Sequence, residues 1–298
     1  MIVRPRPGLM DVAFALRGSV LPRIKGRLAL ITLLSVAAVM TARLHPGIFS
    51  QISAIPFTLM GIALSVFMSF RNNACYDRWW EGRKLWGSLI IACRSLARRT
   101  TILEMADRRL VLTGLCGFTA GLAARLRGAD ERAAIARHAG DGPWLGAVNP
   151  ADALLQHLGR HCLLLMQDGR IGAIHHSLLE EQLHLLAQVQ AGCERIQLTP
   201  LPFSYSLLLH RTATIFCLTL PFALAGALGW WTLLPAVLVS YTFFGLDALG
   251  DQLEDPFGLE PNDLPIDAMT RTVEREMLSA LGETILPPPI EAKANILT

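Results

Sequence analysis

Carboxylate side chains, which supply the oxygen ligands that calcium prefers, are concentrated near the C-terminal end of the sequence. The acidic residues of this segment are Asp247, Asp251, Glu254, Asp255, Glu260, Asp263 and Asp267. The run Pro256–Gly258 interrupts them, and Asp263 precedes Pro265, a position from which a carboxylate can cap the start of a helix. The residues therefore allow a calcium site or a helix cap, and we favour the cap.

Histidines and cysteines give weaker indications of chemistry. His157 and His161 are spaced so that both lie on one helix face. No Glu lies between them as in an H-E-x-x-H zinc motif, and two histidines alone more often serve packing or the surface. The cysteines form no C-x-x-C pair, which favours free thiols. P-loop, G-x-S-x-G and G-x-G-x-x-G motifs are missing from the sequence, so we expect no enzyme, no cofactor and no metal.

Charge is distributed very unevenly along the 298 residues, of which 17% are charged and 52% hydrophobic. Soluble domains usually carry about 25% charged residues. Three blocks contain no Asp, Glu, Lys or Arg: Leu28–Ala42, Leu44–Phe70 and Thr212–Leu246. A bilayer-spanning helix needs roughly 20 apolar residues, so these blocks predict four spans, with turns near His45–Gly47 and Gly229–Trp231. A buried helix pair in a soluble core is the alternative, but three such blocks are hard to bury without lipid.

Basic residues set the expected orientation. Arg23, Lys25 and Arg27 precede the first apolar block, which starts too late for a cleavable signal peptide. They predict a cytoplasmic N-terminus, and an even number of spans returns the C-terminus to the same side. The net charge of +3 suits contact with anionic lipid headgroups and is too small and scattered to suggest nucleic acid.

We therefore expect an all-α integral membrane protein with a helical cytoplasmic domain. The predicted parts are a cytoplasmic N-terminal segment (1–27), transmembrane helices 1 and 2 (28–70), a cytoplasmic helical region (71–211), transmembrane helices 3 and 4 (212–246), and a cytoplasmic acidic segment with a last helix and tail (247–298).

Two features of the predicted cytoplasmic region concern its helices. The second span continues into residues 71–91 without a helix breaker, which predicts one helix that leaves the membrane. Gly114, Gly117 and Gly121 have the spacing that lets helices approach closely. The segment 85–127 that carries them is helical by period and is either a fifth span or a buried cytoplasmic helix, and we favour the buried helix because arginines closely bracket its uncharged part.

The second span carries an apolar stripe. Ile62, Val66 and Phe70 are spaced by four and share a helix face, with Ser65 and Ser69 beside it. Around a symmetry axis such a stripe would form stacked apolar rings, and hydrophobic constrictions can gate a pore by dewetting. Contact with lipid or with another helix is the ordinary alternative for apolar residues on a membrane helix.

Three motifs resemble the bacterial branch of the bestrophin family of ion channels. The first runs from Arg71-Asn-Asn through Tyr76-Asp-Arg-Trp-Trp-Glu-Gly-Arg-Lys-Leu-Trp-Gly87. The second is Cys193-Glu-Arg-Ile196 followed by Thr199-Pro-Leu-Pro202, Tyr205 and His210-Arg211. The third is Asp251-Gln-Leu-Glu-Asp-Pro-Phe-Gly258 with Asn262-Asp-Leu-Pro265. They follow the family's order and span nearly the whole chain.

The resemblance implies a homopentamer in a bacterial inner membrane, with a central pore that passes monovalent ions down their gradients. The neck of the pore would be formed by Ile62, Val66 and Phe70, and a second, cytoplasmic constriction would fall on the helix around Ile174–Leu178, with Ile174 and Leu178 as its candidates. Animal members bind calcium with a denser acidic cluster than Leu259–Asp263, which has only two carboxylates, so calcium activation is not expected here.

The sign of the permeant ion is not fixed by these residues. The family includes anion-selective animal channels and cation-selective bacterial ones, and the bacterial character with the aliphatic Val66 favours cations. An anion (chloride) channel of the same fold is the alternative. A secondary transporter is disfavoured because paired broken helices are missing from the sequence. A non-conducting membrane-anchored protein whose cytoplasmic helices bind a partner is the remaining alternative.

Overall fold

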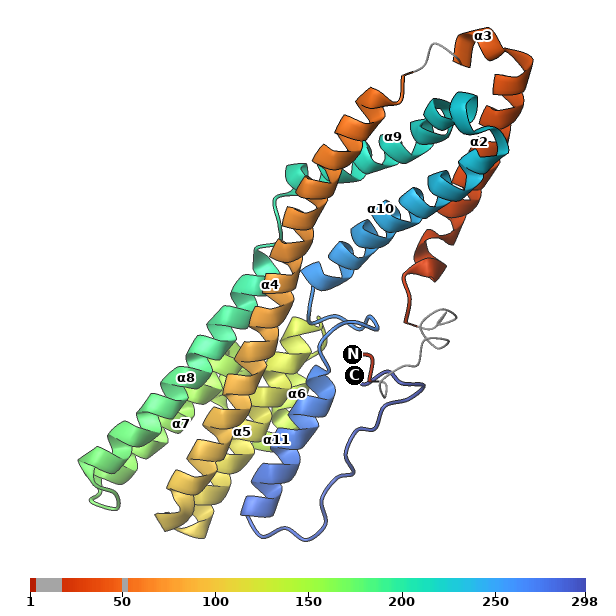
Figure 1. The fold of residues 1–298 in the computed structure, drawn as a ribbon. Helices are drawn as coiled ribbons and strands as arrows, with labels where there is room; N and C mark the ends of the chain where they lie inside the picture. The colour runs from red at the N-terminus through yellow and green to blue at the C-terminus, as the bar shows by residue number, and fades with distance from the viewer. Residues whose placement is uncertain (4–17, 50–52) are drawn as a thin grey trace. The chain divides into compact units, whose positions relative to one another are not determined.

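The computed structural model describes residues 1–3, 18–49 and 53–298, and all regular elements within these ranges are helices (Figure 1). The α-helices are α2 (Leu21–Leu44), α3 (Pro46–Phe49), α4 (Ile55–Arg99), α5 (Met105–Leu126), α6 (Glu131–Ala139), α7 (Pro150–Gln167), α8 (Ala173–Leu198), α9 (Phe203–Leu228), α10 (Leu233–Glu254) and α11 (Ile266–Ala280). Short 3-10 helices are η1 (Thr100–Ile102), η2 (Pro143–Gly146) and η3 (Gly229–Thr232). The all-α prediction is confirmed, whereas much of the segment 1–27 lies outside the described residues.

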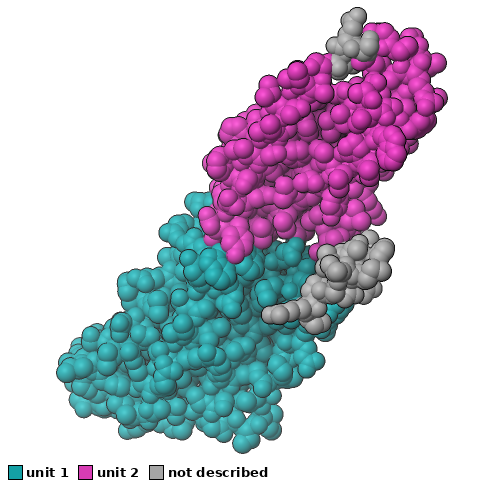
Figure 2. Space-filling model, in the orientation of Figure 1, with its two compact units in different colours: residues 1–4, 79–199, 255–298 teal, residues 5–78, 200–254 magenta. Residues whose placement is uncertain are grey.

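The described chain forms two compact units, each with its own core (Figure 2). Unit 2 contains α2, α3, α9, α10 and the part of α4 that ends at Arg78. Unit 1 contains the rest of α4, from Trp79 onward, together with α5, α6, α7, α8 and α11. The helix α4 thus belongs to both units, as expected from the absence of a breaker between the second apolar block and residue 91.

Unit 2 consists of helices whose ends follow from their sequence. Pro22 stands in the first turn of α2, where its missing N–H costs no hydrogen bond. Gly229 ends α9 with a φ of 53°, a left-handed conformation that glycine adopts without a steric penalty. The turn η3 then separates α9 from α10, at the position where the third apolar block was expected to fold back.

Four helical stretches of the described chain are long and apolar enough to cross a membrane: Leu21–Leu44, Ile55–Ile102, Met105–Leu126 and Phe203–Glu254. The last stretch contains both α9 and α10, with η3 between them. In the apolar windows of the first, second and fourth stretches only 28%, 17% and 22% of residues are buried, whereas 67% are buried in α5. The large exposed apolar side chains of unit 2 lack a protein environment in the single chain, which is the pattern expected for helices that face lipid or other subunits.

Unit 1 has a conventional hydrophobic core, and α5 runs through it. A Cβ added at Gly114 would lie 2.7 Å from Leu158 Cδ2, and one added at Gly121 would lie 2.5 Å from Ile135 Cγ1. The glycines therefore let α7 and α6 approach α5 closely, as their spacing predicted. The burial of α5 within unit 1 supports the interpretation of this segment as a core helix rather than a fifth span.

Two helices of unit 1 begin at residues whose side chains cap them. Asp130 accepts a hydrogen bond from the Ala133 N–H at the start of α6, and Asn149 accepts one from the Asp152 N–H at the start of α7. The last helix, α11, buries an apolar stripe made of Ile266, Met269, Val273 and Met277, with Leu281 just beyond its end. This amphipathic packing is the usual source of stability for a short helix.

Candidate pore-lining face

The predicted neck residues lie on one exposed face of α4. Ile62, Val66 and Phe70 have 60%, 47% and 60% of their surface exposed in the single chain. Ile55 and Leu59 continue the same exposed apolar stripe toward the start of the helix. A continuous exposed apolar stripe of this kind marks a candidate contact surface for lipid or for other subunits.

The opposite face of α4 packs inside unit 2. Leu64 and Met68 are buried in its hydrophobic core, and Gly61 lies against the ring of Phe216, where an added Cβ would be 3.2 Å from Cζ. Because residues 64 and 68 lie on the far side of the helix from 62, 66 and 70, this packing directs the predicted neck residues away from the core.

The two serines beside the stripe are also exposed. The Ser65 hydroxyl donates a hydrogen bond of 2.7 Å to the carbonyl oxygen of Gly61, one turn earlier. This bond satisfies the hydroxyl proton within the helix, and the oxygen still presents a polar surface beside Val66. Ser65 and Ser69 therefore add polar edges to an otherwise apolar face.

The candidates for the cytoplasmic constriction lie on α8 in unit 1. Ile174 is 82% exposed and Leu178 is 40% exposed, and they share a face in the first turns of the helix. Arg99 donates to the carbonyl oxygen of Leu178 and lies 3.5 Å from a carboxylate oxygen of Glu181. An apolar pair on this exposed face is therefore followed by an ion pair one turn further along α8.

A charged cluster that sequence reasoning missed lies inside unit 2, centred on Asp247 of α10. Asp247 is 2% exposed and accepts hydrogen bonds from three helices. These come from Arg71 Nη1 of α4 at 3.1 Å, His210 Nδ1 of α9 at 2.7 Å and Arg27 Nη1 of α2 at 3.4 Å. The sequence showed Asp247 only as the first residue of an acidic segment, although the family motif containing Arg71 was the available signal.

The acidic segment as a whole does not form the cluster that calcium binding would need. Among the residues that the structure describes, no three His, Cys, Asp or Glu side chains are grouped so that they could hold a metal ion. The prediction that Asp263 caps the last helix is wrong, because Pro265 is the N-cap of α11 and no side chain caps it. Asp263 instead accepts a hydrogen bond of 2.7 Å from the Glu260 N–H, within the turn that precedes the helix. Burial is the main cause that raises the pKa of Asp263 to about 6; the hydrogen bond from the Glu260 N–H lowers it, and the nearby carboxylates of Asp255 and Glu260 raise it. The residues therefore do not fit a calcium site.

The pair His157 and His161 is separated by its contacts. His161 Nε2 lies 3.0 Å from Asp107 Oδ1, whereas the His157 ring packs against Trp144 with centroids 4.7 Å apart. Burial lowers the pKa of His157, and His161 lowers it further. The two rings thus serve different contacts rather than one metal.

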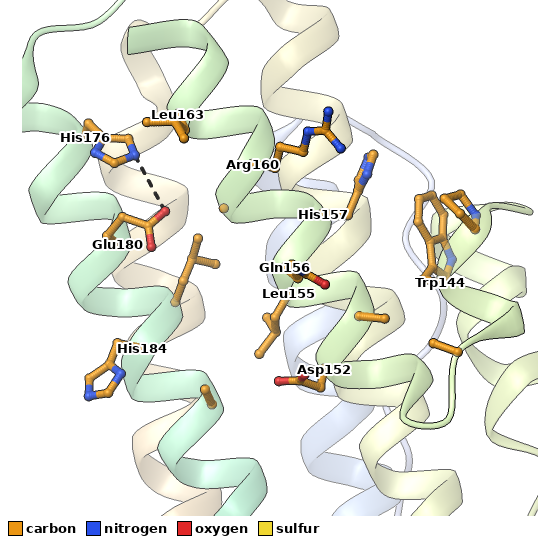
Figure 3. Close-up of a pocket in the computed structure, with 16 residues that line it drawn as sticks. Trp144, Asp152, Leu155, Gln156, His157, Arg160, Leu163, His176, Glu180 and His184 are labelled. Atoms are coloured by element: carbon orange, nitrogen blue, oxygen red, sulfur yellow. Dashed lines mark ion pairs between the residues drawn. The ribbon is translucent and has the colours of Figure 1, made fainter. Parts of the chain in front are cut away.

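His157 also lines a groove of about 1050 Å³ between α7 and α8 (Figure 3). Its lining includes the polar side chains of His176 and Glu180 on α8 and of Gln156 and Arg160 on α7. His176 Nε2 and Glu180 Oε1 are 3.7 Å apart, and Leu155 is one of the apolar side chains between the two helices. None of the predicted pore residues lines this groove.

Comparison with known proteins decides the family. A family model described as Bacterial/Fungal Bestrophin protein matches residues 1–279. The chain belongs to the bacterial and fungal bestrophin family. The resemblance drawn from the motif that begins at Arg71 is therefore confirmed.

Relatives match this bestrophin along nearly its full length. A voltage-dependent anion channel-forming protein of Mesorhizobium japonicum is 45% identical over 297 residues, which cover 97% of this chain and 94% of the relative. A protein of the same name from Escherichia coli K12 is 38% identical over 295 residues, which cover 97% of each chain. The crystal structure of a bestrophin homolog from Klebsiella pneumoniae is 38% identical and has a TM-score of 0.83, covering 88% of this chain and 100% of that chain.

Proposed function

We propose that this bestrophin is the subunit of an ion channel in the inner membrane, and that five copies surround a central pore. The observation that carries the proposal is the two-sided character of α4. One face, with Leu64 and Met68, is buried in unit 2, and the other presents Ile62, Val66 and Phe70 to the outside of the chain. A ring of copies would bring these apolar side chains together as the neck.

Ions would cross this neck passively. Rings of uncharged aliphatic and aromatic side chains around the pore offer no coordinating oxygen to a dehydrated ion, so the neck acts as a barrier until it is wetted. Ile174 and Leu178 would form the second, cytoplasmic constriction, because they are the exposed apolar pair near the start of α8. Neither constriction resembles an enzyme active site, and the proposed activity needs no cofactor.

Anions are the permeant ions that we propose, which corrects the expectation of cations from the sequence. The relatives from Mesorhizobium japonicum and Escherichia coli are both named voltage-dependent anion channel-forming proteins. The expectation of cations rested on the bacterial character of the sequence and on the aliphatic Val66, and an uncharged side chain carries no preference for the sign of an ion.

Contacts between the two ends of the chain support the location of both termini on the same side of the membrane. The Leu297 N–H donates a hydrogen bond of 2.8 Å to the carbonyl oxygen of Met1, and Ile2 pairs with Ile296. Both ends therefore belong to unit 1. The basic residues that begin α2 support a cytoplasmic location for them, with anionic lipid headgroups as neighbours.

The test is a planar bilayer recording of the purified protein with NaCl at different concentrations on the two sides. We expect single-channel currents that reverse near the equilibrium potential of chloride. Reversal near the equilibrium potential of sodium would support a channel that conducts cations, as the sequence had led us to expect. Silence in a preparation shown to be pentameric would contradict the channel and favour the non-conducting, partner-binding protein.

The neck has its own test. Replacing Val66 and Phe70 with Ala should raise single-channel conductance or open probability, because smaller side chains widen the barrier and let it wet. Leu33→Ala is the matched control, since Leu33 is a 69% exposed apolar residue on α2. Unchanged currents in the Val66→Ala, Phe70→Ala double variant would remove this face of α4 from the pore.

A further inference from the structure

Arg71 follows the neck residue Phe70 directly, but its side chain lies on the other side of α4. It is 2% exposed, among the most completely buried large side chains of the described chain. Met68 and Cys75, which share its face, are fully buried. A guanidinium inside a bundle of apolar helices is costly unless carboxylates pair with its charge, so its position needs a specific reason.

Three carboxylates of α10 meet this guanidinium. Nη1 lies 3.1 Å from Asp247 Oδ1, and Nη2 donates to Asp251 Oδ1 and lies 3.8 Å from Glu254 Oε2. The three acidic residues recur at intervals of about one helical turn, so they present one face of α10 to α4. The planar fork of arginine has directed donors, and its pairing with two carboxylates fixes orientation as well as charge.

A glycine of α10 makes room for this contact. A Cβ added at Gly250 would lie 2.6 Å from Asn72 Oδ1 and 3.1 Å from Arg71 Nη1. The surface of α10 is therefore hollowed where the polar side chains of α4 arrive. The contact is built into the sequences of both helices.

The acceptor Asp247 is itself held in place. His210 Nδ1 of α9 and Arg27 Nη1 of α2 both contact Asp247 Oδ2, whereas Arg71 binds Oδ1. The guanidinium carbon of Arg27 also lies over the Phe244 ring, 5.4 Å from its centroid. The carboxylate that receives Arg71 is thus oriented from two further helices of unit 2.

We propose that Arg71 is a positioning residue for the pore: its ion pairs with Asp247 and Asp251 fix the rotation of α4 about its axis. That rotation determines whether Val66 and Phe70 point toward the pore or toward the core. The apolar contacts of Leu64 and Met68 tolerate small rotations, because dispersion contacts are not directional, whereas the guanidinium fork does not. The inference rests on the proposed function, since it assigns the neck to α4.

The test measures the rotation directly with single cysteines. Phe70→Cys reports the exposed face and Met68→Cys the buried face, and the native cysteines among the described residues are all buried. A membrane-impermeant methanethiosulfonate reagent is applied to pentameric protein in liposomes, and the ratio of the two modification rates is measured. With Arg71 present we expect rapid modification at position 70, with altered currents, and protection at position 68.

Arg71→Met should lower this ratio by about tenfold, the shift that a coupling in the usual range for contacting residues produces. Arg71→Lys should restore it in part, since the lysine keeps the charge and loses the fork. Asp251→Asn is the milder variant if Arg71→Met does not fold, because the Asp251 side chain is 57% exposed, and it should lower the ratio by a few-fold.

The outcomes separate the two proposals. An unchanged ratio in Arg71→Met, or in Asp251→Asn where only that variant folds, would overturn the positioning role while Phe70→Cys still alters currents. If Phe70→Cys is not modified even with Arg71 present, the neck assignment fails and the positioning role fails with it. A lowered ratio that Arg71→Lys restores in part supports the inference.

Discussion

Helices α2 and α5 are similar in length, and their most apolar windows have mean hydropathies of 1.7 and 1.2, but they differ in their surroundings. Both are long and apolar enough to cross a membrane, yet 28% of the apolar window is buried in α2 and 67% in α5. The glycines of α5 meet side chains of α6 and α7, whereas a Cβ added at Gly26 of α2 would meet nothing within 4 Å. A helix apolar enough to span a membrane is therefore surrounded by protein where neighbouring elements can pack closely against it, as α6 and α7 do against α5.

The two units also differ in where their charged side chains lie. Unit 2 places Arg71 and Asp247 in its interior, each 2% exposed. Unit 1 keeps many ion pairs at its surface, such as Glu81 with Arg195, whose side chains are 39% and 65% exposed. Interior charge pairs and exterior apolar side chains are typical of helices in lipid, where water is not available to a charge on the outside.

The largest expected effect comes from removing the interior carboxylate of unit 2. Asp247→Ala leaves Arg71 without its 3.1 Å partner, and breaking a buried pair in this way costs about 3–5 kcal/mol. Glu81→Ala, the control, breaks an exposed pair and should cost less than about 1 kcal/mol. Thermal unfolding in detergent measures both. If Asp247→Ala and Glu81→Ala lower Tm by the same amount, the ion pairs of Asp247 are exposed to water.

The second effect concerns a buried carboxylate of unit 1. The pKa of Asp263 rises from its ordinary 3.8 to about 6 because of burial. The folded state therefore binds this proton more tightly, so stability falls as the pH rises from about 4 to about 6, by at most about 3 kcal/mol. Asp263→Asn keeps an acceptor for the Glu260 N–H and should flatten this part of the pH dependence of Tm. An unchanged pH dependence would show that Asp263 titrates normally.

A smaller effect, with opposite signs in the two helices, is expected at glycines. Gly121→Ala in α5 places a Cβ 2.5 Å from Ile135 Cγ1, and such overpacking costs about 1–3 kcal/mol. Gly26→Ala in α2 meets open space and should stabilise the helix by about 0.5–1 kcal/mol. Tm values of the two variants in the same detergent make the comparison. A gain in Tm for Gly121→Ala would contradict the close packing of α5.

The smallest effect is expected from calcium. Chelation with EGTA during bilayer recording should leave the currents nearly unchanged, because Leu259–Asp263 contributes only two carboxylates. A strong loss of current, restored by added calcium and not by magnesium, would show that the acidic segment binds the ion after all.

Much of the fold follows from the sequence because it depends on local signals. The uncharged blocks, the missing breaker after Phe70 and the turn at Gly229 predicted the helices α2, α4, α9 and α10, and the apolar stripe of α11 followed from its period. The motif beginning at Arg71 predicted the family. The exposed face with Ile62, Val66 and Phe70 was also predicted from spacing, and its role as the neck stays a prediction.

Tertiary structure decided what local patterns leave open, namely which partner each polar or small residue meets. Gly82 of the first motif lies against Phe257 of the third, where an added Cβ would be 3.1 Å from Cε1. Asp247, read in the sequence as one more acidic residue, became the acceptor shared by Arg71, His210 and Arg27. The physical reason is that helix period and hydropathy are properties of neighbouring residues, whereas an ion pair between residues 71 and 247 exists only after the chain has brought α4 and α10 together.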